Sequence, residues 1–187
     1  MHPTDGAPGK EVHHTGRHLR FCTIGHWEYI ERTRAESAVV VAALTPEREV
    51  VLVEQHRPPL QGQVIELPAG LVGDDGAEEA LEAARRELLE ETGFEAANWQ
   101  FVTTGPISPG LSTETIHLLV ATGLTRRNGG GGVHGESIRV HLVSIAQAHP
   151  WLEARRSEGK LVDPKVYAGL FFLMTQDRNA AGPPGRA

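Results

Sequence analysis

One segment, between Gly70 and Phe94, limits the possible folds of this chain more than any other part of its sequence. Within it, Glu87, Glu90 and Glu91 are spaced i, i+3 and i+4, so on a helix of 3.6 residues per turn their side chains share one face. Carboxylates this close repel one another unless a cation lies among them, and Mg²⁺ prefers hard oxygen ligands. The pattern therefore predicts a helix with a metal-binding face.

The same segment also has an apolar side. Leu81, Ala84 and Leu88 recur at helical spacing and would anchor the helix against a core. This stripe disfavours the alternative that the acidic face is only solvated. We expect the helix to span about 76–92 and to end at Gly93, because glycine accepts the left-handed conformation that follows many helices.

Apolar and β-branched runs predict strands on both sides of this helix. The expected strands are 19–33 (a pair that turns at Gly25), 37–44, 49–56, 63–67, 99–106, 115–121 and 137–144, and the expected later helices are 145–158 and 163–176, the last with Asp163 as N-cap. A glycine run at 128–132 is expected to be flexible, since glycine leaves the backbone many states. Strands around a central helix, closed by a C-terminal helix, favour an α/β or α+β sandwich.

Length and composition fit a single domain. We expect flexible tails at 1–15 and 179–187 around one domain at 16–178, whose N-terminal β segment spans about 18–34. The formal net charge of −6 argues against a general binder of nucleic acid or membrane surfaces. With one cysteine, no secretory start and no apolar run near 18 residues, we expect a cytoplasmic protein.

The segment resembles the Nudix box of Nudix hydrolases. The residues that match are Gly70, Glu78, Arg86, Glu87, Leu88, Glu90, Glu91, Gly93 and Phe94. Seven residues instead of the family's five separate Gly70 from Glu78, and the aromatic Phe94 stands where the family has an aliphatic residue. The resemblance implies an α/β/α Nudix sandwich with a mixed central sheet, preceded by a small N-terminal β region.

Flanking residues resemble one group, the ADP-ribose and ADP-sugar pyrophosphatases. Pro109 lies sixteen residues beyond Gly93, as in that group, and the other similar stretches are 27–32, 54–59, 65–70, 108–112 and 136–140. The resemblance implies hydrolysis of ADP-ribose to AMP and ribose 5-phosphate, with Mg²⁺ as cofactor and Mn²⁺ as a substitute. It also implies a homodimer in which the N-terminal segment reaches the other subunit.

The resemblance further implies roles for residues around the helix. Glu87, Glu90 and Glu91, together with the backbone carbonyl of Ala69, would hold the metal. Arg86 would orient these carboxylates through charge-assisted hydrogen bonds.

The implied substrate contacts lie upstream of the helix. Trp27 would stack on adenine and Glu28 would bind the edge of the base, although a core position for Trp27 fits the sequence equally well. Arg32 and Arg57 would contact the diphosphate or the base, because a guanidinium group presents a planar fork of donors. Glu66 would lie near the metals, unless it faces solvent.

The general base is expected in the segment after the glycine run. Glu136 is the first candidate, because the mobile glycines would let it close over bound substrate. His134 is the second, since histidine accepts a proton near neutral pH. ADP-glucose, GDP-mannose, NADH and a flavin dinucleotide remain alternative substrates. A sensor that binds a nucleotide sugar without cutting it is disfavoured, because the chain keeps all three helix carboxylates.

Overall fold

Apolar and β-branched runs form the two most deeply buried strands. β4 (Ser37–Ala43) and β5 (Glu49–Arg57) are buried along most of their length, because both faces of each strand are covered. The structure is a computed structural model that describes residues 9–35, 37–73, 76, 78–133, 135 and 137–180, with the backbone alone for 176–180.

These two strands belong to two neighbouring four-stranded sheets. The other strands of the body are β6 (Gly62–Glu66), β7 (Ala69–Val72), β8 (Phe94–Pro106), β9 (Thr115–Arg126), β10 (Ile138–Ser144) and β11 (Leu161–Val162). The strand orders are β7-β4-β9-β8 and β10-β5-β6-β11. The β4–β9 and β6–β11 pairs are parallel and the others antiparallel, so the body has the mixed pairing that was expected.

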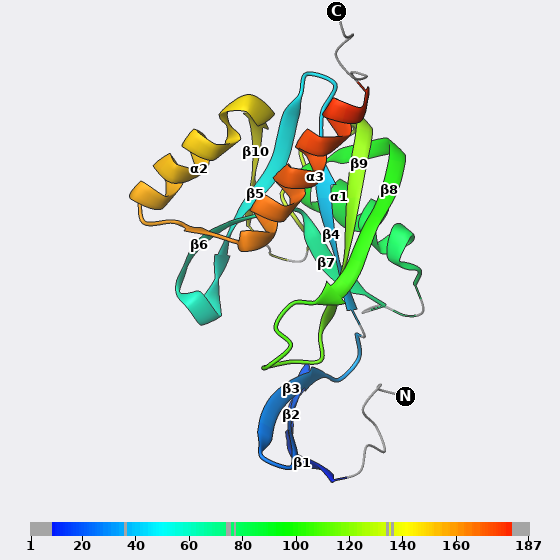
Figure 1. The fold of residues 1–187 in the computed structure, drawn as a ribbon, viewed down its shortest axis with the longest axis vertical. Helices are drawn as coiled ribbons and strands as arrows, with labels where there is room; N and C mark the ends of the chain where they lie inside the picture. The colour runs from blue at the N-terminus through cyan, green and yellow to red at the C-terminus, as the bar shows by residue number, and fades with distance from the viewer. Residues whose placement is uncertain are drawn as a thin grey trace, which may run out of the picture.

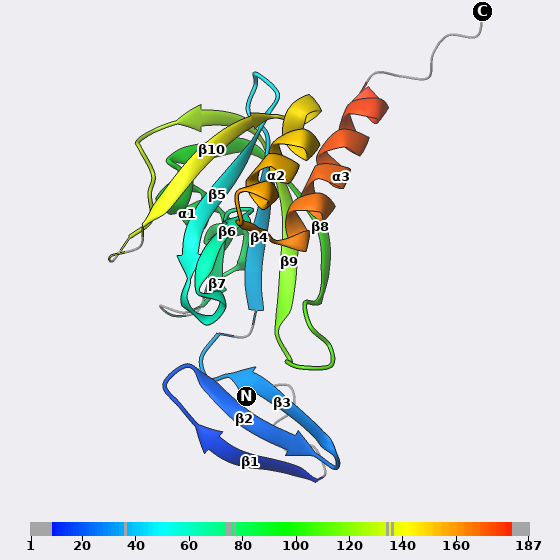
Figure 2. The same cartoon turned by 90° about the vertical axis from the view of Figure 1, so that its left-hand side faces the viewer.

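Helices cover both sides of the strands. The helices are α1 (Ala80–Thr92), α2 (Ala148–Ser157) and α3 (Pro164–Ala180), with short 3₁₀ turns η1 (Pro58–Leu60) and η2 (Ile145–Gln147). Figure 2 shows α1 on one side of the strands and α2 and α3 on the other. Ala84 and Leu88 anchor α1 in one apolar cluster, and Leu152 and Leu170 anchor α2 and α3 in a second. This arrangement confirms the α/β/α sandwich.

A separate antiparallel sheet precedes the body. It consists of β1 (Lys10–Thr15), β2 (Leu19–Ile24) and β3 (Trp27–Arg32), which lie beside one another below the body in Figure 1. The expected turn at Gly25 joins β2 to β3. The expectation of a tail over 1–15 is wrong for β1, because its backbone pairs with β2 along its length.

The carboxylate-bearing helix is shorter than expected. α1 begins at Ala80 instead of near Gly76, and Glu79 before it has an extended backbone with φ −78° and ψ 147°. Its end is as expected, because Gly93 is left-handed with φ 76° and its N–H donates to the carbonyl of Leu89. Within the described residues, no helix is long and apolar enough to span a membrane.

The glycine run packs against the end of α1, a contact that its composition did not predict. The N–H groups of Gly131 and Gly132 donate to the carbonyls of Glu91 and Glu90, at 2.8 and 3.1 Å. A Cβ on Gly130 would lie 2.4 Å from the carbonyl carbon of Thr92, so only glycine permits this approach. The run therefore caps the helix that bears the carboxylates.

Candidate active site

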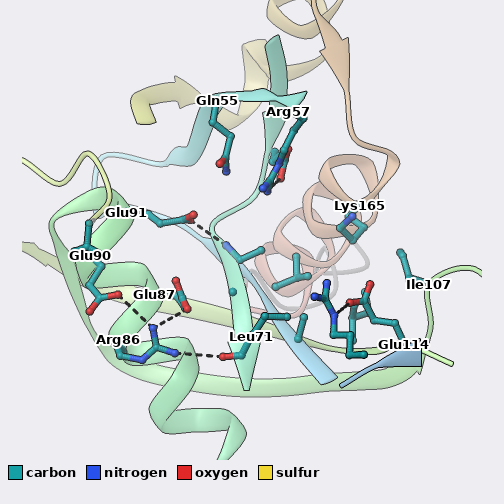
Figure 3. A pocket seen from close by; sticks show the side chains of 18 of the residues that line it. Gln55, Arg57, Leu71, Arg86, Glu87, Glu90, Glu91, Ile107, Glu114 and Lys165 are labelled. Carbon is teal, nitrogen blue, oxygen red and sulfur yellow. Dashed lines mark hydrogen bonds and ion pairs between the residues drawn. The ribbon is translucent and has the colours of Figure 1, made fainter. Parts of the chain in front are cut away.

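A cavity of about 830 Å³ opens between α1, β7 and the ends of β5 and β6. Figure 3 shows the glutamates of α1 on one side of this cavity, and Arg57 and Lys165 on the other. The charged residues that line it are Arg17, Arg32, Arg57, Glu66, Arg86, Glu87, Glu90, Glu91, Glu114 and Lys165. An acidic wall that faces basic side chains suits a ligand that carries phosphate groups beside a metal cation.

Arg86 gathers the acidic side chains of α1 around one guanidinium group. Its Nη1 donates to Glu87 at 2.7 Å and to Glu90 at 3.2 Å. Its Nε and Nη2 donate to the two oxygens of Glu78, at 3.1 and 3.2 Å, and Nη2 also donates to the carbonyl of Leu71. The hydrogen bonds from Arg86 lower the pKa of Glu78 and raise the pKa of Arg86. The expected orienting residue therefore contacts two of the three expected metal ligands.

Glu91 and Glu87 are held against β7. Glu91 is 4% exposed and accepts a hydrogen bond from the N–H of Ala69 at 3.0 Å. The side chain of Glu87 lies over Gly70, where an added Cβ would come within 1.9 Å of its carboxyl carbon. Gly70 therefore leaves the space that Glu87 occupies, and this role follows from packing rather than from backbone flexibility.

The opposite wall contains two arginine–glutamate pairs. Arg57 donates to both oxygens of Glu66, from Nε at 2.7 Å and from Nη2 at 2.6 Å. Glu66 is 6% exposed, which excludes the alternative that it faces solvent. Arg32, from the N-terminal sheet, forms an ion pair with Glu114, which precedes β9. Both expected arginines therefore line the cavity.

Trp27 and Glu28 do not line the cavity of their own chain. Trp27 is 56% exposed, so the alternative of a core tryptophan is wrong, and its ring lies beside Gly110. Both residues belong to β3, which also supplies Arg32. Any contact of Trp27 with a base in this cavity would require a rearrangement or a second subunit.

The two candidates for the general base, Glu136 and His134, lie outside the described residues. The N–H of Ile138, at the start of β10, donates to the carbonyl of Gly131 at 3.2 Å. This contact joins the start of β10 to the glycine run beside the C-terminal end of α1.

The side chains on α1 suit a hard divalent cation by their chemistry. Glu87, Glu90 and Glu91 provide carboxylate oxygens from adjacent turns, the donor type that Mg²⁺ and Mn²⁺ take. In the described part of the chain, no three or more His, Cys, Asp or Glu side chains lie close enough together to hold a metal ion. In this arrangement Arg86 supplies the positive charge to Glu87 and Glu90, so these glutamates would hold a cation only after their side chains turn toward it.

Several lining residues were not expected from the sequence, among them Arg17, Gln55, Glu114 and Lys165. The sequence did contain a feature that places Lys165 beside Asp163. Asp163 was expected to cap α3, and its Oδ1 accepts the N–H of Lys165 at 2.8 Å. The side toward which Lys165 points depends on the parallel pairing of β11 with β6, and β11 was not expected.

The fold and the cavity together define an α/β/α protein in which the glutamates of one helix face basic side chains across a cavity. Residues 34–163 match the family model of the NUDIX domain. The chain therefore belongs to the Nudix hydrolase family.

Three relatives extend this assignment. The chain is 32% identical over 148 residues to a methanol dehydrogenase activator of Bacillus methanolicus. This match spans 79% of this chain and 77% of that protein. It is 33% identical over 150 residues to a GDP-mannose pyrophosphatase of Escherichia coli (strain K12). This match spans 76% of this chain and 75% of that protein. It is 37% identical over 95 residues to an ADP-ribose pyrophosphatase of Bacillus subtilis (strain 168), and this match spans 51% of the chain and 50% of that relative.

A crystal structure of an ADP compounds hydrolase has the same fold. The two structures superpose with a TM-score of 0.69 over 91% of this chain and 92% of the other, at 20% sequence identity. At this identity the likeness supports the fold and not the substrate.

Proposed function

We propose that the protein hydrolyses the pyrophosphate bond of a nucleoside diphosphate sugar, with ADP-ribose as the first candidate and AMP and ribose 5-phosphate as its products. The observation that carries this proposal is the opposition of two walls in one cavity. Glu87, Glu90 and Glu91 line one side, and Arg57 lines the other. Two bridged phosphates would fit between a metal held by the glutamates and the guanidinium donors.

Glu87, Glu90 and Glu91, with the backbone carbonyl of Ala69, would hold Mg²⁺, for which Mn²⁺ could substitute. When bound, such a cation supplies positive charge for the phosphate oxygens and lowers the pKa of an attacking water. Arg86 orients these glutamates, because its guanidinium group donates hydrogen bonds to Glu87 and Glu90.

The remaining side chains would bind the substrate and move a proton. Arg57 would donate to the phosphate oxygens in place of part of its pairing with Glu66, which holds the fork in position beforehand. Glu136 would take the proton of the attacking water, with His134 as the alternative. The electrons of that O–H bond would form the new bond to phosphorus, and the bridging oxygen would leave with one of the two products.

GDP-mannose is the second candidate, and a specific observation favours it. The match to the Escherichia coli GDP-mannose pyrophosphatase covers 76% of the chain, whereas the match to the Bacillus subtilis ADP-ribose pyrophosphatase covers 51%. The relative from Bacillus methanolicus is named for its action on a dehydrogenase, so we include NADH among the substrates to be tested. A non-catalytic sensor is disfavoured by the full set of glutamates on α1.

We also expect a homodimer, because Trp27 and Glu28 lie outside the cavity of their own chain. In a dimer, Trp27 could stack on the base in the cavity of the partner, and Glu28 could bind its edge.

A substrate panel tests the proposal. Purified protein with Mg²⁺ is incubated with ADP-ribose, ADP-glucose, GDP-mannose, UDP-glucose and NADH, and the products are separated by chromatography. We expect AMP and ribose 5-phosphate from ADP-ribose, with kcat/KM at least about tenfold above that for the guanine and uracil sugars. Equal rates for all bases, or a preference for guanine, would move the assignment to the GDP-sugar alternative. No turnover on any of them would refute the proposed function.

A further inference from the structure

A second cavity adjoins the one that contains the glutamates. It has a volume of about 690 Å³ and lies around the start of α3, beside β11 and the 3₁₀ turn η1. The two cavities share four lining residues, Arg57, Glu66, Ile107 and Lys165, so a ligand in one can extend into the other. The proposed hydrolysis uses two of these shared residues, Arg57 and Glu66, and none of the residues that line the second cavity alone.

The polar feature of this second cavity is a pair of side chains at the start of α3. Asp163 and Lys165 form an ion pair and are 15% and 25% exposed. The N–H of Asp163 donates to the carbonyl of Ile65 at 2.9 Å, and its Oδ1 accepts the N–H of Lys165 at 2.8 Å. Backbone contacts on both sides therefore fix the pair at the boundary of the two cavities. A binding group that is held in this way loses little entropy when a ligand arrives.

The charges of this cavity are balanced in pairs. Arg57 is bonded to Glu66, and Lys165 is bonded to Asp163, so the four charged lining residues have no net charge. A further phosphate would need cations in excess of carboxylates. A neutral ligand rich in hydroxyl groups instead finds donors and acceptors side by side, because carboxylates accept and ammonium or guanidinium groups donate.

The rest of the lining is apolar. Leu60 is 58% exposed, Leu161 is 44% exposed and Ile107 is 38% exposed. Their exposed surfaces would pack against the C–H groups of a sugar ring, while the polar pair binds its hydroxyls. A mostly apolar pocket with few convergent polar groups is typical of small-molecule sites.

We propose that this second cavity binds the sugar half of the substrate, and that Asp163 and Lys165 recognise the hydroxyl groups of that sugar. The inference rests on the proposed function, since it places the diphosphate between the glutamates and Arg57. From there the sugar extends toward α3. The nucleoside half extends toward Arg32 of β3 and toward Arg17 in the turn between β1 and β2. Asp163 and Lys165 are thus binding residues that decide specificity, not groups that act on the phosphorus.

The test compares two substrates that differ only in the distal sugar. In ADP-ribose the β-phosphate carries this sugar, and in the methyl ester of ADP the β-phosphate carries a methyl group instead. The variants are Asp163→Asn, which keeps a side chain able to cap α3, and Lys165→Met, which keeps the unbranched stem. Arg156→Met is the matched control, because it removes a positive charge at an exposed position outside both cavities.

We expect each variant to lower kcat/KM for ADP-ribose by at least about tenfold, mainly through KM. Asp163→Asn should change kcat/KM for the methyl ester by less than about twofold, because Asp163 lines only the second cavity. Lys165 lines both cavities, so Lys165→Met should lower kcat/KM for ADP-ribose by a larger factor than for the methyl ester. Arg156→Met should leave both substrates unchanged. An unchanged Tm for each variant shows that a loss on ADP-ribose does not come from unfolding.

The outcomes separate this inference from the proposed function. Equal losses on both substrates, or no loss on ADP-ribose, would overturn the sugar site while the proposed hydrolysis stands. A larger loss on the methyl ester would overturn it as well. If the wild-type protein cleaves none of the panel substrates, the proposed function fails and the sugar site fails with it. If it cleaves only GDP-mannose, the same comparison is made between GDP-mannose and the methyl ester of GDP.

Discussion

Gly70 is a position where one added carbon atom has a large expected consequence. It lies in β7 opposite Val39, and the side chain of Glu87 fills the space above it. The sequence supplied the glycine as part of a motif, but its physical reason is visible only in the structure. Glu87 approaches from a helix seventeen positions later in the chain, and no local pattern predicts such a contact.

Replacing Gly70 with alanine should therefore impair catalysis more than stability. The added Cβ would lie 1.9 Å from the carboxyl group of Glu87, so that flexible side chain must move. We expect kcat to fall by about 10²-fold, the effect of misplacing a catalytic group by about 1 Å, while the free energy of unfolding changes by less than about 1 kcal/mol. Gly105→Ala in β8 is the control, because a Cβ there meets no atom within 4 Å. Similar kinetics for the two variants would argue against this role of Gly70.

The glutamates of α1 differ in their suitability for mutation. Glu91 is 4% exposed and bonded to Ala69, so its replacement would disturb packing together with any metal site. The side chain of Glu90 is 31% exposed, which makes it the cleaner test of function.

Glu90→Gln should lower kcat by about 10²-fold, since the amide is a poor ligand for a hard cation and cannot neutralise charge. The Tm should change little, because the substituted side chain is partly exposed and similar in shape. Turnover measured with Mg²⁺ and with excess chelator tests directly whether the reaction needs the metal. Full activity in the chelator would contradict the proposed metal site.

Side chains of the motif in β5 alternate between the two faces of the strand, so the residues of one motif have two different roles. Gln55 and Arg57 line the cavity, whereas Glu54 points to the other face of the strand, as expected for a period of two residues. There Glu54 is 6% exposed and is bonded to Lys160 at 2.8 Å, and the Nε2 atom of His141 lies 2.8 Å from it. The motif that indicated substrate binding therefore also contains a residue that links β5 to β10 and to the turn before β11.

The sequence predicted most elements of the body but not those that depend on distant partners. Strands β4 and β5 were expected from their apolar runs, and α3 from its Asp163-Pro164 start. β7 and β11 are only four and two residues long, and they exist because β4 and β6 offer them backbone partners. The start of α1 was misplaced because Glu78 bonds Arg86 and remains outside the helix.

The Glu54 contacts predict a pH-dependent contribution to stability. Burial raises the pKa of Glu54, but hydrogen bonds from Lys160 and His141 outweigh it, so its pKa lies below the ordinary value. A depressed folded-state pKa means that the stabilisation is complete at neutral pH and is lost as the pH falls through that pKa. We expect Glu54→Gln to lower the free energy of unfolding by about 2 kcal/mol near pH 7.

The difference between wild type and Glu54→Gln should begin to shrink as the pH falls through the ordinary glutamate value of about 4, and should vanish below the depressed folded-state pKa, where the wild-type carboxyl group is also neutral. Urea unfolding at a series of pH values measures it. Glu153→Gln is the control, because Glu153 is exposed and forms only a surface pair with Arg156. A difference that stays constant with pH would contradict the assigned ion contacts.

The body and the N-terminal sheet meet over a small set of contacts. Ile30 exchanges backbone hydrogen bonds with Leu111 and Thr113, at 2.9 and 3.2 Å, and Arg32 pairs with Glu114. These contacts bring Arg32 into the cavity of its own chain but leave Trp27 outside it. The sequence predicted both residues as substrate contacts and could not separate them, because their positions depend on how the sheet docks.

A subunit-mixing experiment tests whether Trp27 acts in a partner. Trp27→Ala alone should lower kcat/KM by at least about tenfold, because stacking on a base contributes about 1–3 kcal/mol. If the proposed dimer shares its sites, mixing Trp27→Ala with Glu90→Gln should restore roughly one intact site in four. The mixture is prepared by refolding the two variants together, and light scattering gives its mass. Activity equal to the mean of the two parent variants would place Trp27 in its own subunit.

The cap that the glycine run places on α1 has a consequence for hydrogen exchange. The amide hydrogens of Gly131 and Gly132 are bonded to the carbonyls of Glu91 and Glu90, so they exchange with solvent only when this contact opens. Their exchange rates therefore measure how often the carboxylate-bearing turn loses its support. In deuterated water, the exchange rates of these two amides would report how often the site opens. They cover a timescale that turnover measurements do not resolve.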